Sequence, residues 1–246
     1  MSTQELKELF NVLYDNIASK GAPGLDDFEI SLFLTMAQEE LVKNKDEYKS
    51  NKLQEGFENS SKRRTDLKQL IKNYSTSETL DIEGSINDNS KFYEIPEDVF
   101  LIKSEKVTLN DPNCGVVTAT VVPKTHDEYN IQINNPFKKP SKNTVWRMDF
   151  SSTEPGQNIV ELISNLNIVK YDLRYIKKPN PIILTDLTAG DFEDENLTIL
   201  GQTQQQTSEL DSSVHSEIVR RAVELATLSF KENNLQNIVN LYQRKE

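Results

Sequence analysis

The clearest secondary-structure signal in the chain is the C-terminal segment Leu210-Asp211-Ser212-Ser213-Val214-His215-Ser216-Glu217-Ile218-Val219-Arg220-Arg221-Ala222-Val223-Glu224-Leu225-Ala226. Three polar residues at its start carry side-chain oxygens that can accept hydrogen bonds from a first helical turn, which makes Asp211, Ser212 and Ser213 candidate N-caps. The apolar residues that follow recur at helical spacing and predict one buried stripe, formed by Val214, Ile218, Ala222, Leu225 and Ala226.

The N-terminal part is also predicted to be helical. Ser2 with Glu5, and Asp26 with Glu29, have the spacing of capping boxes, in which each side chain binds the backbone N–H of the other residue. A third helix is predicted from Ser60 or Ser61 as far as Tyr74. One apolar face is expected for the first helix, formed by Leu6, Leu9, Phe10, Leu13 and Ile17. The second, longer helix is predicted to run toward Tyr48 from its apolar residues Phe28, Leu32, Phe33, Met36, Leu41 and Val42.

The middle of the chain has the pattern of strands. Short β-branched or alternating runs are separated by turn residues such as Pro96, Pro155-Gly156 and Pro179-Asn180-Pro181. Because the strands follow one another closely without intervening helices, the pattern favours an antiparallel sandwich or a barrel-like sheet. The predicted strands are Lys91–Ile95, Leu101–Leu109, Val116–Val122, Tyr129–Asn134, Val145–Phe150, Asn158–Ile163, Asn167–Ile176, Ile182–Leu184 and Leu197–Leu200.

These segments predict an α+β fold in which helices from both ends of the chain pack into one bundle. An antiparallel β-sandwich or barrel-like domain is inserted between them. The predicted boundaries give an N-terminal helical part at 1–75, an inserted β domain at 76–205 and C-terminal helices at 206–246 that pack on the N-terminal part. Gly201 to Glu209 is predicted to be the linker back to the helices.

Composition limits the classes of function. The chain has 246 residues, a net charge of −11 and 36% apolar residues. Sustained binding along a nucleic-acid backbone needs clustered Lys and Arg, so this charge argues against wholesale DNA binding. Cys114 is the single cysteine, which excludes an intramolecular disulfide. No apolar run approaches the length of a membrane span, and the start lacks the form of a signal peptide.

No motif predicts a catalytic residue, a metal site or a cofactor. The two histidines, His126 and His215, lack the spacing of a zinc protease, and a Cys–His nucleophile has no supporting local signature. His126 is expected at a β-turn, and His215 in the first turn of its helix. The acidic run Asp191 to Glu195 lacks the spacing and pivot glycine of a calcium loop. Trp146 is expected in the core of a sheet.

Three sets of residues are candidates for contacts with other molecules. The basic run is either an exposed helix face or a docking patch for an acidic neighbour or for DNA phosphates. Two Lys pairs beside prolines at strand ends predict stiff, protruding loops, for which protection of a sheet edge is an equally good explanation. The basic run is Lys62, Arg63, Arg64 and Lys68, and the loops carry Phe137, Lys138 and Lys139, then Lys177 and Lys178.

Several stretches, taken in order, resemble the head-to-tail connector (adaptor or ring) proteins of tailed bacteriophages, in the form found in crAss-like phages. The resemblance covers nearly the whole chain, and the order of the stretches within a helix–β–helix layout carries it. The matching stretches are Phe10–Ile17, Ala22–Glu40, Lys62–Leu67, His126–Tyr129, Asn135–Phe137, Tyr175–Pro179 and His215–Ala226. The inserted β region is larger here than in the simplest connectors.

The resemblance implies a structural virion protein at the head–tail junction of the portal vertex, made in the cytoplasm of the bacterial host. Such proteins form a closed ring, typically dodecameric, that docks under the portal protein and contacts an adjacent tail or ring protein. Genomic DNA passes through the ring during ejection, and no membrane is involved. In the wider family the C-terminal segment reaches toward the portal, which transfers to Leu235, Ile238, Val239, Leu241, Tyr242 and Arg244.

Physical reasoning is consistent with a ring. A closed ring needs two different contact patches on each subunit. An acidic lumen repels phosphates and lets DNA slide, so we predict a net acidic ring lumen. Two alternatives stay open: another tail or cargo-associated structural protein, and a glycan-binding protein or hydrolase that uses the β domain.

Overall fold

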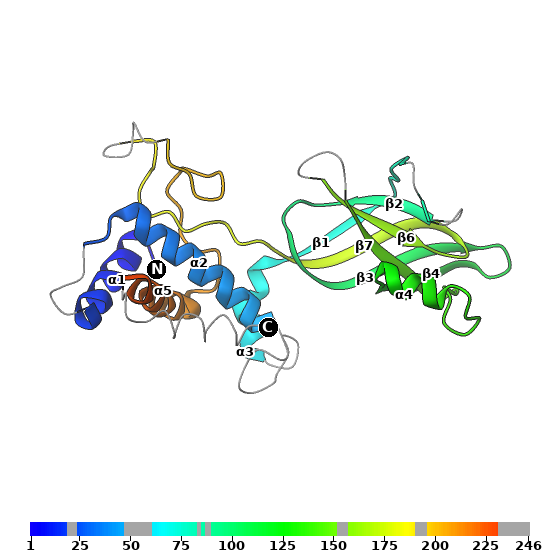
Figure 1. The fold of residues 1–246 in the computed structure, drawn as a ribbon, viewed down its shortest axis with the longest axis horizontal. Coiled ribbons are helices and arrows are strands. Elements are labelled where there is room, and N and C mark those ends of the chain that lie inside the picture. The colour runs from blue at the N-terminus through cyan, green and yellow to red at the C-terminus, as the bar shows by residue number, and fades with distance from the viewer. Residues whose placement is uncertain are drawn as a thin grey trace. The chain divides into compact units, whose positions relative to one another are not determined.

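The computed structural model describes residues 1–18, 24–46, 61–82, 85–86, 90–151, 157–189 and 196–230. The chain divides into two compact units. The helical unit consists of residues 1–70 and 179–246, and the β unit is the continuous stretch 71–178 (Figure 1). The crossings between units therefore fall at 70/71 and 178/179, whereas the sequence analysis drew its boundaries at 75/76 and 205/206.

The helical unit contains α1 (Thr3–Ala18), α2 (Asp27–Asp46), α3 (Ser61–Leu67) and α5 (His215–Phe230). One-turn 3-10 helices flank two of them, η2 (Lys68–Leu70) after α3 and η4 (Ser212–Val214) before α5. Helix α5 packs against both α1 and α2. No helix within the described ranges is long and apolar enough to cross a membrane.

Both predicted capping boxes are confirmed. The backbone N–H of Glu5 donates to Ser2 Oγ over 3.2 Å, and that of Ser2 donates to a Glu5 carboxylate oxygen over 2.9 Å. Asp26 and Glu29 make the same reciprocal pair before α2. Asp211 is confirmed as a cap, since its carboxylate accepts from the N–H of Ser213 at the start of η4.

The β unit is one curled sheet of seven strands in the order β1-β7-β3-β4-β5-β6-β2 (Figure 1). All neighbouring strands are antiparallel except β4 and β5, which are parallel and joined through α4 (His126–Gln132). The strands are β1 (Ile71–Thr76), β2 (Ser90–Ile95), β3 (Val99–Asp111), β4 (Gly115–Pro123), β5 (Thr144–Ser151), β6 (Asn158–Ile163) and β7 (Asn167–Lys177).

The α+β class is therefore confirmed, but the sheet differs from the predicted one. It is a single mixed sheet that curls into a half-barrel, and the described residues 71–82, 85–86, 90–151 and 157–178 form no second layer of strands as a sandwich would. The sequence prediction missed the parallel pair because it read Tyr129–Asn134 as a strand. Those residues belong largely to α4, where Thr125 Oγ1 accepts from the N–H of Glu128 and caps the helix. His126 is therefore the first residue of a helix and not part of a β-turn.

A helix prediction was wrong at the start of the unit. The third predicted helix was extended to Tyr74, but the helix ends at Leu67 and Ile71–Thr76 forms β1. This strand pairs along its whole length with β7, from Ile71 opposite Ile176 to Thr76 opposite Tyr171. A strand defined by a partner about a hundred residues away leaves no local signal in its own sequence.

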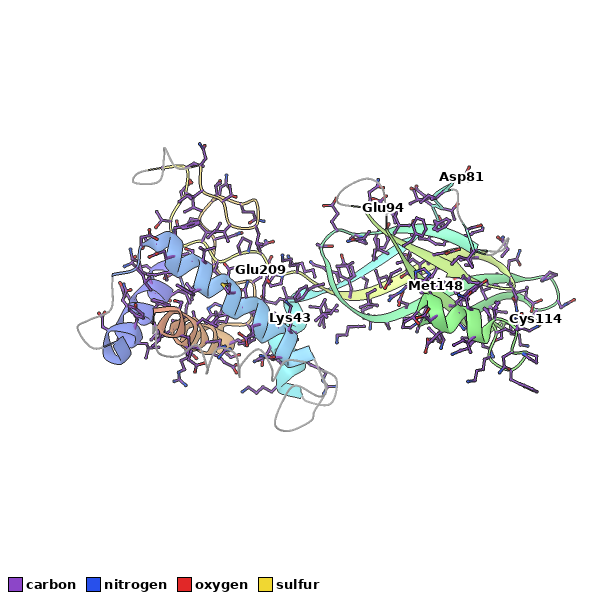
Figure 2. All side chains as sticks on the ribbon, viewed as in Figure 1. Lys43, Asp81, Glu94, Cys114, Met148 and Glu209 are labelled. Carbon is purple, nitrogen blue, oxygen red and sulfur yellow. The ribbon has the colours of Figure 1, made fainter. Side chains whose placement is uncertain are left out.

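The sheet buries apolar side chains on both faces. The concave face holds the main core, to which β2, β3, β4, β5, β6 and β7 all contribute. On the other face α4 covers Trp146, Met148 and Ile163 with its Tyr129, whose ring meets the Trp146 ring edge-on at 6.1 Å. Figure 2 shows Met148 on β5 beside α4. Trp146 is buried, as predicted.

Candidate interaction surfaces

Polar side chains on one face of α2 bind the backbone of the extended segment at residues 180–184. Thr35 Oγ1 accepts from the N–H of Ile182 over 3.1 Å, and Ser31 Oγ accepts from the N–H of Leu184 over 3.0 Å. Gln38 Nε2 donates to the carbonyl of Asn180 over 2.7 Å. The predicted strand Ile182–Leu184 is therefore wrong as a part of the β domain, because the segment lies on a helix in the helical unit.

Two apolar residues of α2, in contrast to its buried polar residues, are exposed to solvent. Leu32 and Met36 belong to the apolar residues from which the helix was predicted, and they are 36% and 53% exposed. The buried apolar residues of the helix are Ile30, Leu34, Ala37, Leu41 and Val42. Since Leu32 and Met36 are four residues apart, they lie on one face of the helix. Two carboxylates, Glu29 and Glu39, are three residues before and three residues after this pair and lie on the same face.

The basic run lies in α3 and η2. Lys62, Arg64 and Lys68 are exposed, and Arg63 belongs to the same helix. Helix α3 is held to its neighbours by a buried ion pair, in which Lys45 Nζ lies 2.6 Å from Asp66 Oδ2 and 3.0 Å from Glu217 Oε2. The exposed cations are thus presented from an anchored helix.

The loop between α4 and β5 forms a compact, exposed tip. Phe137 is 96% exposed, and Lys138 and Lys139 beside it are exposed as well. The loop is held by its own bonds, because the N–H groups of Lys138 and Lys139 both donate to the carbonyl of Asn135, over 3.1 and 3.0 Å. The N–H of Phe137 donates to Asn135 Oδ1 over 3.0 Å. The predicted stiff, protruding loop is therefore what the structure contains.

The second Lys pair is less prominent. Lys177 ends β7 and Lys178 follows it, and both side chains are partly buried. The N–H of Lys178 donates to the carbonyl of Asp98 over 2.7 Å, so this segment is tied to the sheet and does not protrude as a loop.

Sequence reasoning missed a polar hollow on the outer face of β1, β7 and β3. Its volume is about 300 Å³, and mostly polar residues line it. Arg174 Nε donates to Asn73 Oδ1 over 2.9 Å, and Ser75 Oγ donates to Asp172 Oδ1 over 2.5 Å. The Lys170 and Ser75 hydrogen bonds to Asp172 outweigh its partial burial and lower the pKa of that carboxyl. The side chains therefore already bind one another.

The concave core of the β unit contains an ionic group. Arg147 Nη1 lies 2.7 Å from Glu105 Oε2, and the hydroxyl of Tyr171 donates to the other oxygen of Glu105. Burial, together with the negative charge of Glu105, raises the pKa of Tyr171, and burial raises that of Tyr93 to about 12. Because this group is enclosed by strands, its role is structural.

The residues that were considered for a catalytic or metal site have separate local roles. His215 begins α5, as predicted, and its Nε2 lies 3.0 Å from the carbonyl of Leu210 while Nδ1 lies 2.9 Å from the Met1 nitrogen. Cys114 is exposed at the β3–β4 turn (Figure 2). Within the part of the chain that the structure describes, no group of three or more His, Cys, Asp or Glu residues could hold a metal ion.

Two sets of candidates lie outside the described residues. The first is the acidic run Asp191 to Glu195. The second is the candidate portal interface, formed by Leu235, Ile238, Val239, Leu241, Tyr242 and Arg244.

Formal charge is unequally divided between the two units. The helical unit has 24 Asp and Glu against 15 Lys and Arg, a net charge of −9, while the β unit has 15 against 13, a net charge of −2. The acidic balance predicted to exclude wholesale DNA binding is therefore mainly a property of the helical unit.

Comparison with known proteins gives the family. Residues 1–237 match the model of the phage tail ring protein 3/4 family. The chain belongs to this family. It is 40% identical over 249 residues to "Ring protein 4/5" of Bacteroides phage crAss001, with the whole of both chains covered. It is also 36% identical over 234 residues to "Ring protein 3" of the same phage, covering 93% of this chain and 96% of that relative. The resemblance to crAss-like phage ring proteins is confirmed.

Proposed function

We propose that this chain is a structural subunit of a closed ring in the head–tail connector or tail region of a bacteriophage particle, and that it performs no catalytic step. The observation that carries the proposal is the match to the ring family over residues 1–237, together with full-length similarity to a ring protein. Loss of an enzymatic activity on replacing His126 or His215 would contradict the non-catalytic part.

The finer proposal is that the ring, dodecameric by analogy with connectors, docks under the portal protein and links it to the next tail or ring protein. The C-terminal segment from Leu235 would supply the contact with the portal. The exposed basic run of α3, with Lys62, Arg64 and Lys68, would contact an acidic neighbour. Its anchoring through the Lys45–Asp66 ion pair supports this role, because an ordered patch loses little conformational entropy on binding.

Genomic DNA would pass through the ring without being held. A net charge of −11, of which −9 belongs to the helical unit, supports a lumen that repels phosphates. An electrostatic map of the assembled ring should therefore show a net acidic channel with any cations in separate bands. A continuous positive channel would contradict this part of the proposal.

The decisive experiment is to locate the chain in intact particles. Cys114 is the single cysteine and is exposed, so a thiol-reactive heavy-metal label can mark each subunit. Electron microscopy should show a ring of label at the head–tail junction that disappears in particles carrying Cys114→Ser. Label along a helical tube or on fibres would favour the tail alternative, and label inside the capsid would favour a cargo protein.

A further inference from the structure

We infer that the tip of the α4–β5 loop docks on the exposed apolar face of α2 in a second copy of this chain. This inference rests on the proposed ring and names one of its subunit contacts. We define the knob as Phe137, Lys138 and Lys139, and the stripe as Glu29, Leu32, Met36 and Glu39.

The knob has the form of a contact residue presented on a rigid support. An aromatic side chain that is 96% exposed leaves its whole apolar surface in water, which is unfavourable unless a partner covers it. The Asn135 carbonyl and side chain hold the next four residues in a tight turn. At the far end of the loop, Asn165 Nδ2 donates to the carbonyl of Pro140, which fixes the loop to the sheet. A preorganised loop loses little entropy when it binds.

The stripe is complementary to the knob in apolar character and in charge. Leu32 and Met36 form an exposed apolar pair, and a thioether next to an aromatic ring is a favourable contact. Glu29 and Glu39 place one carboxylate on each side of that pair, while the knob places two ammonium groups next to its ring. Lys43, labelled in Figure 2, follows Glu39 on the same helix and lies beyond the stripe. The two carboxylates of the stripe therefore flank Leu32 and Met36 with no cation between them.

A second copy is the occupant that these observations favour. The knob lies on the nearly neutral β unit, and the stripe lies on the helical unit, which carries −9 of the net charge. Two different patches that complement each other on the same chain form a heterologous contact, and repetition of such a contact closes into a ring when the rotation permits. An isologous dimer would need one self-complementary patch, and neither the cationic knob nor the acidic stripe is one.

A charge swap tests the contact with the full-length chain. The knob-reversed variant is Lys138→Glu with Lys139→Glu, and the stripe-reversed variant is Glu29→Gln with Glu39→Lys. Glutamine at position 29 can still complete the capping box with Asp26, so α2 keeps its start. Each variant alone should self-associate about tenfold more weakly or worse, because like charges then face each other. An equimolar mixture should recover ring formation, since every contact then joins opposite charges.

The matched control is Lys106→Glu with Arg220→Glu, which changes the net charge by the same amount as the knob variant at exposed positions outside both the contact and the basic run of α3. It should leave self-association within about threefold of the wild-type value, as surface charges away from a contact act weakly. Sedimentation velocity gives the association constants, and the fluorescence of Trp146 reports whether the β unit is folded in each variant.

A disulfide test in assembled particles decides the matter even if the purified wild-type chain stays monomeric. Phe137→Cys and Met36→Cys are combined in a Cys114→Ser background, and non-reducing gels of oxidised particles should show a ladder of covalent oligomers. Rings that remain intact in the microscope while the gel shows monomer only would overturn the docking but leave the proposed function standing. Particles in which no ring contains this chain would overturn the proposed function itself.

Discussion

The two units satisfy their buried polar groups in different ways. In the helical unit, side chains at Ser31, Thr35 and Gln38 bind the backbone of a segment that is about 150 residues away in the sequence. In the β unit the strands satisfy one another's backbone groups, and the buried polar side chains include the ion pair of Arg147 with Glu105. The helical unit thus depends on both ends of the chain at once, whereas the β unit is continuous and holds its own core.

The largest effect is expected from Phe10→Ala. Phe10 is fully buried in α1 and stacks on Tyr14 with ring centroids 5.8 Å apart. Removing a buried aromatic ring costs about 3–5 kcal/mol. Urea unfolding followed by helical circular dichroism should show this loss, while Trp146 fluorescence, which reports the β unit, keeps its midpoint. An equal shift of both signals would mean that the two units unfold as one, and the comparison would fail.

The next effect concerns the ion pair of the β core. Arg147→Met should destabilise the β unit by about 3 kcal/mol, because it removes the cation that neutralises the buried charge of Glu105 and leaves only the Tyr171 hydroxyl bound to it. The double variant Arg147→Met with Glu105→Leu should recover most of that loss, since both charges are then gone. The Trp146 transition measures both. If the double variant is as unstable as the single one, the loss of stability does not come from the unneutralised charge of Glu105.

A smaller effect is expected at the hydrogen bonds between α2 side chains and the backbone of residues 180–184. Thr35→Val keeps the shape of the side chain but leaves the N–H of Ile182 without its acceptor, which costs about 2 kcal/mol. Thr188→Val is the control, because Thr188 is exposed and its N–H and hydroxyl bind the carboxylate of Asp186 two residues away. Hydrogen exchange at Ile182 and Leu184 should accelerate in the first variant and stay unchanged in the second.

The smallest effect is a pH dependence confined to the helical unit. Burial, with a lesser contribution from the Met1 ammonium group, lowers the pKa of His215 despite its hydrogen bond to Leu210. The unfolded chain then binds the proton more readily, so the contribution of His215 to stability is complete above about pH 6.5 and is lost as the pH falls through the lower folded-state pKa.

The measurement is the difference in unfolding free energy between wild type and His215→Gln from pH 7 downward. It should shrink as the pH falls, because the variant has lost this dependence. His126→Gln, at an exposed position, serves as the control and should change nothing. A constant difference over this range would show that His215 does not titrate with unfolding.

Local signals gave the helices and their caps. The capping boxes at Ser2 and Asp26 act over three residues, so their spacing is visible in the sequence. The predicted stripe of α5 is also buried at Val214, Ile218, Ala222 and Ala226. The strand Asn158–Ile163 was predicted with its observed bounds.

Non-local contacts explain why α4 was predicted as a strand. Tyr129, Ile131 and Ile133 alternate like a strand, but the Thr125 cap and the contact of Tyr129 with Trp146 favour a helix there. Such tertiary contacts override local β-propensity.

The apolar pattern of α2 predicts the helix but not which of its residues are buried. Leu32 and Met36 belong to that pattern and are exposed, whereas Ser31 and Thr35, which lie outside it, are buried. The helix in fact buries its hydroxyls against a distant backbone and exposes two of its larger apolar residues. Hydropathy indicates an amphipathic helix but does not say which polar groups will find buried partners. The knob at Phe137 was found because prolines and lysines mark protruding loops locally.

The two crossings between the units lie next to each other, because Ile71 at the start of β1 pairs with Ile176 near the end of β7. An inserted unit whose first and last residues are adjacent can be exchanged without moving the residues on either side of it. Lengthening it, or replacing it with another sheet, changes only what lies beyond that paired base. Exchange of residues 71–178 therefore needs two crossovers in the gene but alters the structure at one place, and the helices that depend on both chain ends stay unchanged.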